Sequence, residues 1–208
     1  MEKISKNKLK EVSKLLNHKT RNEKRLFLVH DLVMIKKAKQ LGLLKEAYET
    51  SSGVIGVIKF LPHKNVGNKI IYLDEISDPT NLGKIIYLMK KHGLKDLMLS
   101  PKCVSVYNEK CLDVCKDNIF DINLSYGDVN TLRKLKEDYQ IVATGLKATK
   151  ELKKLKLKNK FVLVLGNESR GVSDSVLRLA NEVIKIDIKN IDSLNVSVAA
   201  SIIFSNLE

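Results

Sequence analysis

Hydrophobic and polar residues follow one pattern in the first part of the chain and another in the remainder. In residues 1–62, short apolar runs with helical and strand periods predict a small α/β unit. The elements expected there are a helix around residues 9–16, a strand at 26–29, a helix at 31–41 and strands near 45–49 and 54–60. Residues 62–68 are polar and contain a proline and a glycine, so we expect a linker.

From residue 69 onward, predicted strands and helices alternate. Strands are expected at residues 70–73, 96–99, 119–122, 141–143, 161–165 and 182–188, and helices at 82–92, 107–114, 128–139, 173–180 and 194–207. The run at 161–165 is apolar throughout, which is typical of a strand buried on both faces. This alternation predicts a largely parallel sheet covered by helices, with ligands bound at the carboxyl ends of the strands.

Composition narrows the class of protein. Hydrophobic residues make up 44% of the chain and charged residues 29%, and no apolar run reaches the ~18 residues that a membrane helix needs. The first residues lack the apolar core of a signal peptide, and Cys103, Cys111 and Cys115 cannot all pair with one another. We therefore expect a cytoplasmic protein with reduced thiols and no contact with a membrane. These cysteines and the four scattered histidines lack metal-ligand spacing, so no metal site is expected.

The net charge of +13 favours a polyanionic partner such as nucleic acid. Residues 1–62 hold 14 basic and 6 acidic side chains, so most of the excess lies there. A plainer interpretation is heavy use of lysine on the surface, since only five of the 37 basic residues are arginine. The charge alone leaves both interpretations open.

The first of three loops with candidate chemistry follows the strand at 70–73. It turns at an Asp-Pro pair and enters a helix, with Asn81 at the helix mouth. Asn81 is placed either for polar recognition or simply to cap the helix. On the opposite helix face, Lys84, Tyr87 and Lys91 form a basic stripe that suits solvent or a nucleic-acid backbone.

The second loop, residues 165–174, leaves the buried strand through Gly166 and bends again at Gly171. It is not a phosphate-binding loop, because Lys and Ser or Thr do not follow the second glycine and Glu168 would repel phosphate. A dinucleotide fingerprint is absent too. Such a loop suits a cationic or neutral ligand, and we expect Gly166 to leave room for that ligand.

The third loop precedes the last helix. Ser193 is expected to cap that helix, which is apolar on most sides and must be buried against the sheet or a second subunit.

In this order the loops resemble the three motifs of the SpoU/TrmH family of RNA ribose 2′-O-methyltransferases. The motifs are Asn-x-Gly after an Asp-Pro turn, Gly-Asn-Glu, and Ser-Leu-Asn-Val-Ser near the carboxyl end. The resemblance covers residues 69–207. Residues 1–62 look more loosely like the small ribosomal-protein-type RNA-binding domain of many members, here shortened around 49–53. Two domains are expected on this basis, residues 1–62 and 69–208.

The resemblance implies an α/β fold with a Rossmann-related parallel sheet and a C-terminal trefoil knot. It also implies a homodimer that transfers methyl from S-adenosylmethionine to a ribose 2′-hydroxyl of structured RNA, ribosomal RNA being favoured over transfer RNA. The cofactor would be held by the backbones of Gly166, Ile186 and Leu194. The polar centre would consist of Asn81, Glu168, Ser193 and Asn195.

One departure from the family pattern affects catalysis. The first motif normally continues to an arginine that helps to generate or stabilise the ribose alkoxide, and Tyr87 stands at that position. We expect Arg170, two residues after Glu168, to supply the missing charge, with Lys84 as second choice. Two alternatives remain: a non-catalytic RNA-binding relative, and an unrelated nucleotide-binding enzyme of doubly wound fold.

Overall fold

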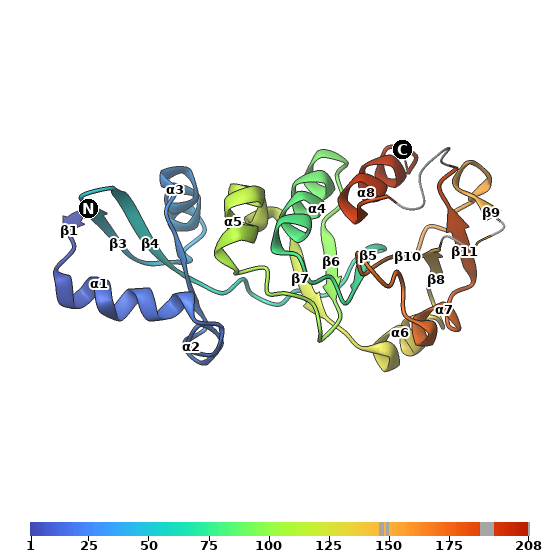
Figure 1. Ribbon diagram of the computed structural model, residues 1–208, viewed down its shortest axis with the longest axis horizontal. Helices are drawn as coiled ribbons and strands as arrows, with labels where there is room; N and C mark the ends of the chain where they lie inside the picture. The colour runs from blue at the N-terminus through green and yellow to red at the C-terminus, as the bar shows by residue number, and fades with distance from the viewer. Residues whose placement is uncertain (146–147, 149, 188–193, 208) are drawn as a thin grey trace.

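The computed structural model describes residues 1–145, 148, 150–187 and 194–207 (Figure 1). Residues 1–59 form a front unit, shown in blue to teal in Figure 1. Its elements are β1 (Glu2–Lys3), α1 (Lys6–Ser13), the 3-10 helix η1 (Lys14–Leu16), α2 (His18–Lys24), β2 (Leu26–Val29), α3 (Leu32–Gln40), β3 (Leu44–Thr50) and β4 (Gly53–Lys59).

The front unit is built on a four-stranded sheet in the order β1-β3-β4-β2. β1 pairs with β3 in parallel, and the other pairs are antiparallel. The sequence pattern did not reveal β1 or α2. α2 has no apolar residue that could show a helical period, and it is defined instead by the cap at Asn17 and the left-handed backbone of Arg25 (φ 50°).

The rest of the described chain forms a seven-stranded sheet with flanking helices. Its elements are β5 (Lys69–Asp74), α4 (Pro79–Lys91), β6 (Asp96–Leu99), α5 (Glu109–Cys115), the 3-10 helix η2 (Lys116–Asp121), β7 (Asn123–Tyr126), α6 (Val129–Leu135), β8 (Gln140–Thr144), β9 (Lys150–Glu151), the 3-10 helix η3 (Leu152–Lys154), β10 (Phe161–Gly166), α7 (Asp174–Leu177), β11 (Glu182–Lys185) and α8 (Val196–Phe204).

All the pairings in this sheet are parallel, and the strand order is β7-β6-β5-β10-β8-β11-β9. The expectation of an α/β fold with a parallel sheet is therefore confirmed. The expectation of a strand at residues 119–122 is wrong, because these residues belong mostly to η2 and the strand begins at Asn123. Ile119 and Ile122 are buried although they lie in or next to a 3-10 helix. An apolar run this short looks the same in a 3-10 helix and in a strand.

Alternate residues of the central strands enter two separate cores. Ile71, Leu73 and Leu163 face the cluster that contains α4, α5 and α8, whereas Tyr72 and Val162 face α6 and α7. The parallel strands are thus covered on both faces, as their nearly continuous apolar sequences predict.

The front unit is joined to the large sheet by a shared core that we call the junction. Phe27 of β2 stacks on Tyr107, with ring centroids 4.7 Å apart, and the backbone N–H of Leu61 donates to the Tyr107 hydroxyl (2.9 Å). Lys37 of α3 forms ion pairs with Asp117 (3.1 Å) and Asp121 (2.9 Å) of η2. The two parts therefore pack as one body through both apolar and charged contacts.

No helix in the described part of the chain is both long enough and apolar enough to cross a membrane.

Candidate active site

The candidate site lies where β5 and β10 end side by side. Their parallel register runs to the pair Asp74 and Gly166. From β5 the chain passes through α4 to β6, and from β10 it passes through α7 to β11 on the other side of the sheet. The carboxyl ends of β5 and β10 therefore form a topological switch point, where open α/β sheets bind their ligands.

The loop after β5 is held in a strained conformation. Glu75 has a φ of 57°, in the left-handed region that non-glycine residues rarely adopt. Its backbone N–H donates to Ser100 Oγ (2.8 Å), which fixes this turn against the loop after β6. Strain of this kind persists only where the surroundings enforce it, and it is common at functional sites.

Asn81 does not cap α4. The N-cap is Asp78, whose carboxylate accepts from the Thr80 N–H (2.7 Å), and Pro79 begins the helix. Asn81 lies within the first turn, is buried, and donates its side-chain N–H to Glu168 Oε1 (3.2 Å). Of the two interpretations of Asn81, the structure thus supports the polar contact.

Glu168 is surrounded by neutral donors from the loop after β5 and the start of α4. Its carboxylate accepts from the Ser77 hydroxyl (3.2 Å), the Ser77 N–H (3.4 Å), the Asp78 N–H (3.3 Å) and Asn81. Partial burial would raise the pKa of Glu168, but these hydrogen bonds outweigh burial and lower it. An ionised carboxylate therefore occupies the amino end of α4 at neutral pH, where the helix dipole favours it.

The loop that carries Glu168 is a tight turn closed by two backbone hydrogen bonds between Asn167 and Gly171, both 2.9 Å. The Asn167 amide donates to the Glu75 carbonyl (2.7 Å), and its oxygen accepts from the N–H groups of Ser169 and Arg170. This one side chain therefore ties the loop after β10 to the loop after β5.

Gly166 is required by the packing of its own loop. A Cβ at this position would lie 2.1 Å from the Val172 nitrogen and 2.2 Å from the Gly171 carbonyl carbon. The missing side chain thus lets the loop fold back on its own strand. The expectation that Gly166 also leaves room for a ligand stays a prediction.

Arg170 lies on the exposed edge of the same loop. Its guanidinium donates to Glu75 Oε2 (2.7 Å), and Lys102 bonds the other carboxylate oxygen (2.7 Å). These contacts, that with Lys102 first, lower the pKa of Glu75. The Arg170 side chain is 70% exposed. Within the described residues its polar contacts do not include Asn81 or Glu168.

Tyr87 lies away from this centre, on the exposed face of α4 that also carries Lys84 and Lys91. The Lys91 ammonium lies 5.2 Å from the Tyr87 ring centroid. The basic stripe expected on this helix is therefore present.

The carboxyl-terminal site residues are only partly described. Ser193 lies outside the described residues, and the N-cap of α8 is Asn195, so the expectation that Ser193 caps this helix is wrong. Asn195 Oδ1 accepts from the N–H (2.9 Å) and hydroxyl (2.7 Å) of Ser197. Ile186 and Leu194 are half-buried. Among described residues no hydrogen bond connects Asn195 with Glu168.

Sequence reasoning missed the residues that hold the loops in place. Asp74 is buried and accepts from the Ser173 N–H (2.8 Å), which fixes the start of α7. Asn167 was part of the recognised motif but received no role, although asparagine directly after a strand often bonds its own turn. Nothing in the local sequence marks Ser77 as a hydrogen-bond partner of Glu168. Across the described ranges there is no group of three or more His, Cys, Asp or Glu residues that could hold a metal ion.

Comparison with known proteins agrees with this geometry. The chain resembles an uncharacterized tRNA/rRNA methyltransferase of Synechocystis (26% identity over 68% of this chain and 52% of that protein). It also resembles the 23S rRNA (guanosine(2553)-2′-O)-methyltransferase RlmP of Bacillus subtilis (25% identity over 74% of this chain and 64% of RlmP). The chain thus spans about half the length of the first relative and just under two thirds of the second.

The fold of this chain is similar to that of a solved structure. The AdoMet-bound rRNA methyltransferase from Sinorhizobium meliloti superposes with a TM-score of 0.89, over 99% of this chain and 96% of that one, at 21% identity. The chain therefore has the α/β fold of these methyltransferases. Residues 68–205 match the model of the SpoU rRNA Methylase family, and the chain belongs to that family.

Proposed function

We propose that this chain transfers the methyl group of S-adenosylmethionine to a ribose 2′-hydroxyl of RNA, with ribosomal RNA favoured over transfer RNA. The observation that carries the proposal is the ionised Glu168, held by Asn81 at the switch point between two loops with family motifs. RlmP, by its name a 2′-O-methyltransferase of ribosomal RNA, is a relative of the chain, which supports this reaction and substrate.

The residues at the switch point suit this cofactor. Donors at the start of α4 already have partners, so they are not free to bind phosphate: the Thr80 N–H bonds the Asp78 carboxylate, and the Asp78 N–H and the Asn81 side-chain amide bond Glu168. S-adenosylmethionine contains no phosphate and carries a cationic sulfonium, which supplies an electrophilic methyl group. We assign the backbones of Gly166, Ile186 and Leu194 to hold it.

The remaining site residues orient the ribose and stabilise charge. The lowered pKa of Glu168 makes it a poor proton acceptor near pH 7, so we assign it a fixed negative charge that Asn81 keeps in place. Ser193 and Asn195 complete the polar centre. Arg170 leaves Glu75 when RNA binds and stabilises the developing alkoxide, a contribution of about 3–4 kcal/mol by analogy with one oxyanion donor.

We further propose a C-terminal trefoil knot, a homodimer, a cytoplasmic location, and a division into a basic RNA-binding domain (1–62) and a methyltransferase domain (69–208). The packing of α8 on both α4 and β10 supports the knot. The apolar helix α8, with Val198 46% exposed, supports pairing of two chains. Light scattering that reports a monomer at micromolar concentration would remove the dimer.

The test is transfer of labelled methyl to RNA from cells that lack this gene. Ribosomal and transfer RNA are incubated separately with the protein and tritiated S-adenosylmethionine, and the label is mapped by alkaline hydrolysis, which a 2′-O-methyl group blocks. We expect label at a hydrolysis-resistant position in ribosomal RNA and none with Glu168→Ala. Label on a base, or in neither RNA, would contradict the proposal.

Tyr87 favours a second candidate, a non-catalytic RNA-binding relative. Its neutral, exposed phenol cannot supply the positive charge of the family's arginine. If the wild type transfers no methyl group where Tyr87→Arg does, the second candidate is correct. If both proteins are active, the methyltransferase proposal stands.

A further inference from the structure

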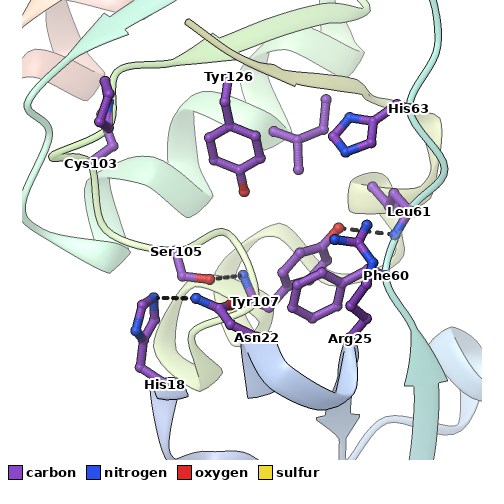
Figure 2. Close-up of a pocket in the computed structure, with 12 residues that line it drawn as sticks. His18, Asn22, Arg25, Phe60, Leu61, His63, Cys103, Ser105, Tyr107 and Tyr126 are labelled. Carbon is purple, nitrogen blue, oxygen red and sulfur yellow. Dashed lines mark hydrogen bonds between the residues drawn. The ribbon is translucent and has the colours of Figure 1, made fainter. Parts of the chain in front are cut away.

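A cavity lies between the front unit and the β7 edge of the large sheet (Figure 2). Its volume is about 330 Å³, at the lower end of the range of ~300–1,000 Å³ found for small-molecule sites. Asn22 and Arg25 line it from the front unit, Phe60 and His63 from the connecting segment, and Tyr107 and Tyr126 from the large sheet domain. Both parts of the molecule therefore contribute to this cavity.

Aromatic rings form two sides of the cavity. Phe60 and Tyr107 stack with centroids 3.9 Å apart and an angle of 22° between their planes. Tyr126 is half exposed, and its hydroxyl points into the cavity opposite them (Figure 2). Partial burial raises the pKa of Tyr126, so its hydroxyl remains a hydrogen-bond donor at neutral pH. Tyr107 is buried between Phe27 and Phe60, so a flat ring entering the cavity would stack on Tyr126, which also offers a donor.

The charge of the cavity is positive. Arg25 lies with its guanidinium carbon 5.3 Å from the Phe60 ring centroid, and in the described part of the chain it has no carboxylate partner. No aspartate or glutamate is among the residues that line the cavity. An anion is therefore favoured beside the aromatic surface.

The cavity is connected to the candidate active site by one short segment of chain, residues 100–105. Ser100 at its start supports the strained Glu75, and Cys103 donates its thiol to the Leu73 carbonyl (3.2 Å). Cys103 and Ser105 then line the cavity. The candidate active site and the cavity therefore lie along one edge of the sheet, formed by the carboxyl ends of β5, β6 and β7.

We propose that the cavity binds one unpaired nucleotide of the RNA substrate, at a position other than the methylated one. Its base stacks on Tyr126, beside the edges of Phe60 and Tyr107, and its phosphate pairs with Arg25. Stacking on aromatic side chains and pairing of phosphates with arginine are the usual means of holding single-stranded RNA. This inference rests on the proposed function, because it assumes that the ligand is RNA.

The test compares a short fluorescein-labelled RNA hairpin that has a single-stranded loop with a fully paired duplex of the same length. The binding of each to the full chain is followed by fluorescence anisotropy. Tyr126→Ala should weaken hairpin binding about tenfold, whereas Tyr126→Phe, which keeps the ring, should bind within about twofold of wild type. Neither variant should change binding of the duplex.

Arg25 has a matched control one residue away. Arg25→Gln should weaken hairpin binding several-fold, whereas Lys24→Gln removes the same charge from an exposed position outside the cavity and should have a smaller effect. Thermal unfolding of each variant shows whether the fold is intact.

The possible outcomes separate the two proposals. If wild type binds the hairpin but Tyr126→Ala and Arg25→Gln bind it equally well, the nucleotide site is wrong and the proposed function stands. If both variants weaken hairpin and duplex alike, the cavity serves general charge attraction, and the site is again wrong. If wild type binds neither RNA, both proposals are overturned.

Discussion

Two carboxylates at the same switch point are held in opposite ways. Glu168 receives only neutral donors, from Ser77, Asp78 and Asn81, and is partly buried. Glu75, on the neighbouring loop, is bonded by the cations Arg170 and Lys102, whose side chains are largely exposed. The pKa of each carboxylate is lowered, by hydrogen bonds in one case and by ion pairs in the other.

This difference separates a fixed charge from a movable one. Neutral donors on the loop after β5 and at the start of α4 hold Glu168 in one geometry, which suits a group that must stay in place. Exposed ion pairs contribute little to stability and are weakened by salt. Arg170 can therefore leave Glu75 at small cost, as our proposed mechanism requires.

The largest expected effect comes from breaking the loop that carries Glu168 and Arg170. Gly166→Ala places a Cβ against the backbone of Gly171 and Val172, so the unfolding free energy should fall by more than about 4 kcal/mol. Gly93→Ala is the control: unlike Gly166 it has a left-handed backbone (φ 67°), but its Cβ would meet nothing within 4 Å. It should cost only about 1–2 kcal/mol. Equal losses in denaturant unfolding would show that the loop tolerates a side chain.

The next effect tests the movable charge. Arg170→Ala should lower kcat/KM for RNA by at least ~100-fold, a loss of ~2.7 kcal/mol or more, with cofactor affinity in calorimetry nearly unchanged. Lys102→Ala removes the other cation from Glu75 and should change the rate less than threefold. A fully active Arg170→Ala protein would show that another group stabilises the alkoxide.

The fixed charge is tested by the isosteric amide. Glu168→Gln replaces one accepting carboxylate oxygen by an N–H₂ donor that faces other donors, so the unfolding free energy should fall by about 1–2 kcal/mol. Glu75→Gln is the matched variant on the other carboxylate and should cost less than about 1 kcal/mol, because its partners are exposed. Equal losses of unfolding free energy in the two variants would show that Glu168 is held no more firmly than Glu75.

The smallest expected effect is in the pH dependence. The pKa of Glu168 is lowered from 4.5 on folding, so the ionised carboxylate stabilises the fold above pH 4.5, and this contribution is lost as the pH falls through the lowered value. The difference in unfolding midpoint between wild type and Glu168→Gln should therefore shrink in acid. A constant difference down to the acid transition would show that the hydrogen bonds do not depend on the charge.

The sequence allowed the centre of the large sheet to be predicted well because strands such as β10 are apolar throughout, whereas the short polar strand β9 was missed. An apolar run such as 161–165 predicts a strand in a sheet that is covered on both faces. Most of the other strands were predicted from similar runs. The short helix α7 and the 3-10 helix η2 were misjudged, since a pattern of a few residues does not distinguish a turn from a strand or a longer helix.

The candidate site could be predicted only in part. The meeting of Asn81 and Glu168 follows from their motifs, but the anchoring of both loops by Asn167, Ser100 and Asp74 depends on contacts between distant segments. The same is true of the cavity at Tyr126, because no local pattern places α2 beside β7.

The junction between the front unit and the large sheet fixes a distance within the molecule. Because the stack of Phe27 on Tyr107 and the ion pairs of Lys37 leave the two parts no free hinge, the distance between the basic front surface and Glu168 is set by the fold. An RNA gripped by the front unit would present to the transfer site only the ribose that lies one such length away. Choice among chemically identical hydroxyl groups would then be made by measuring distance along the RNA.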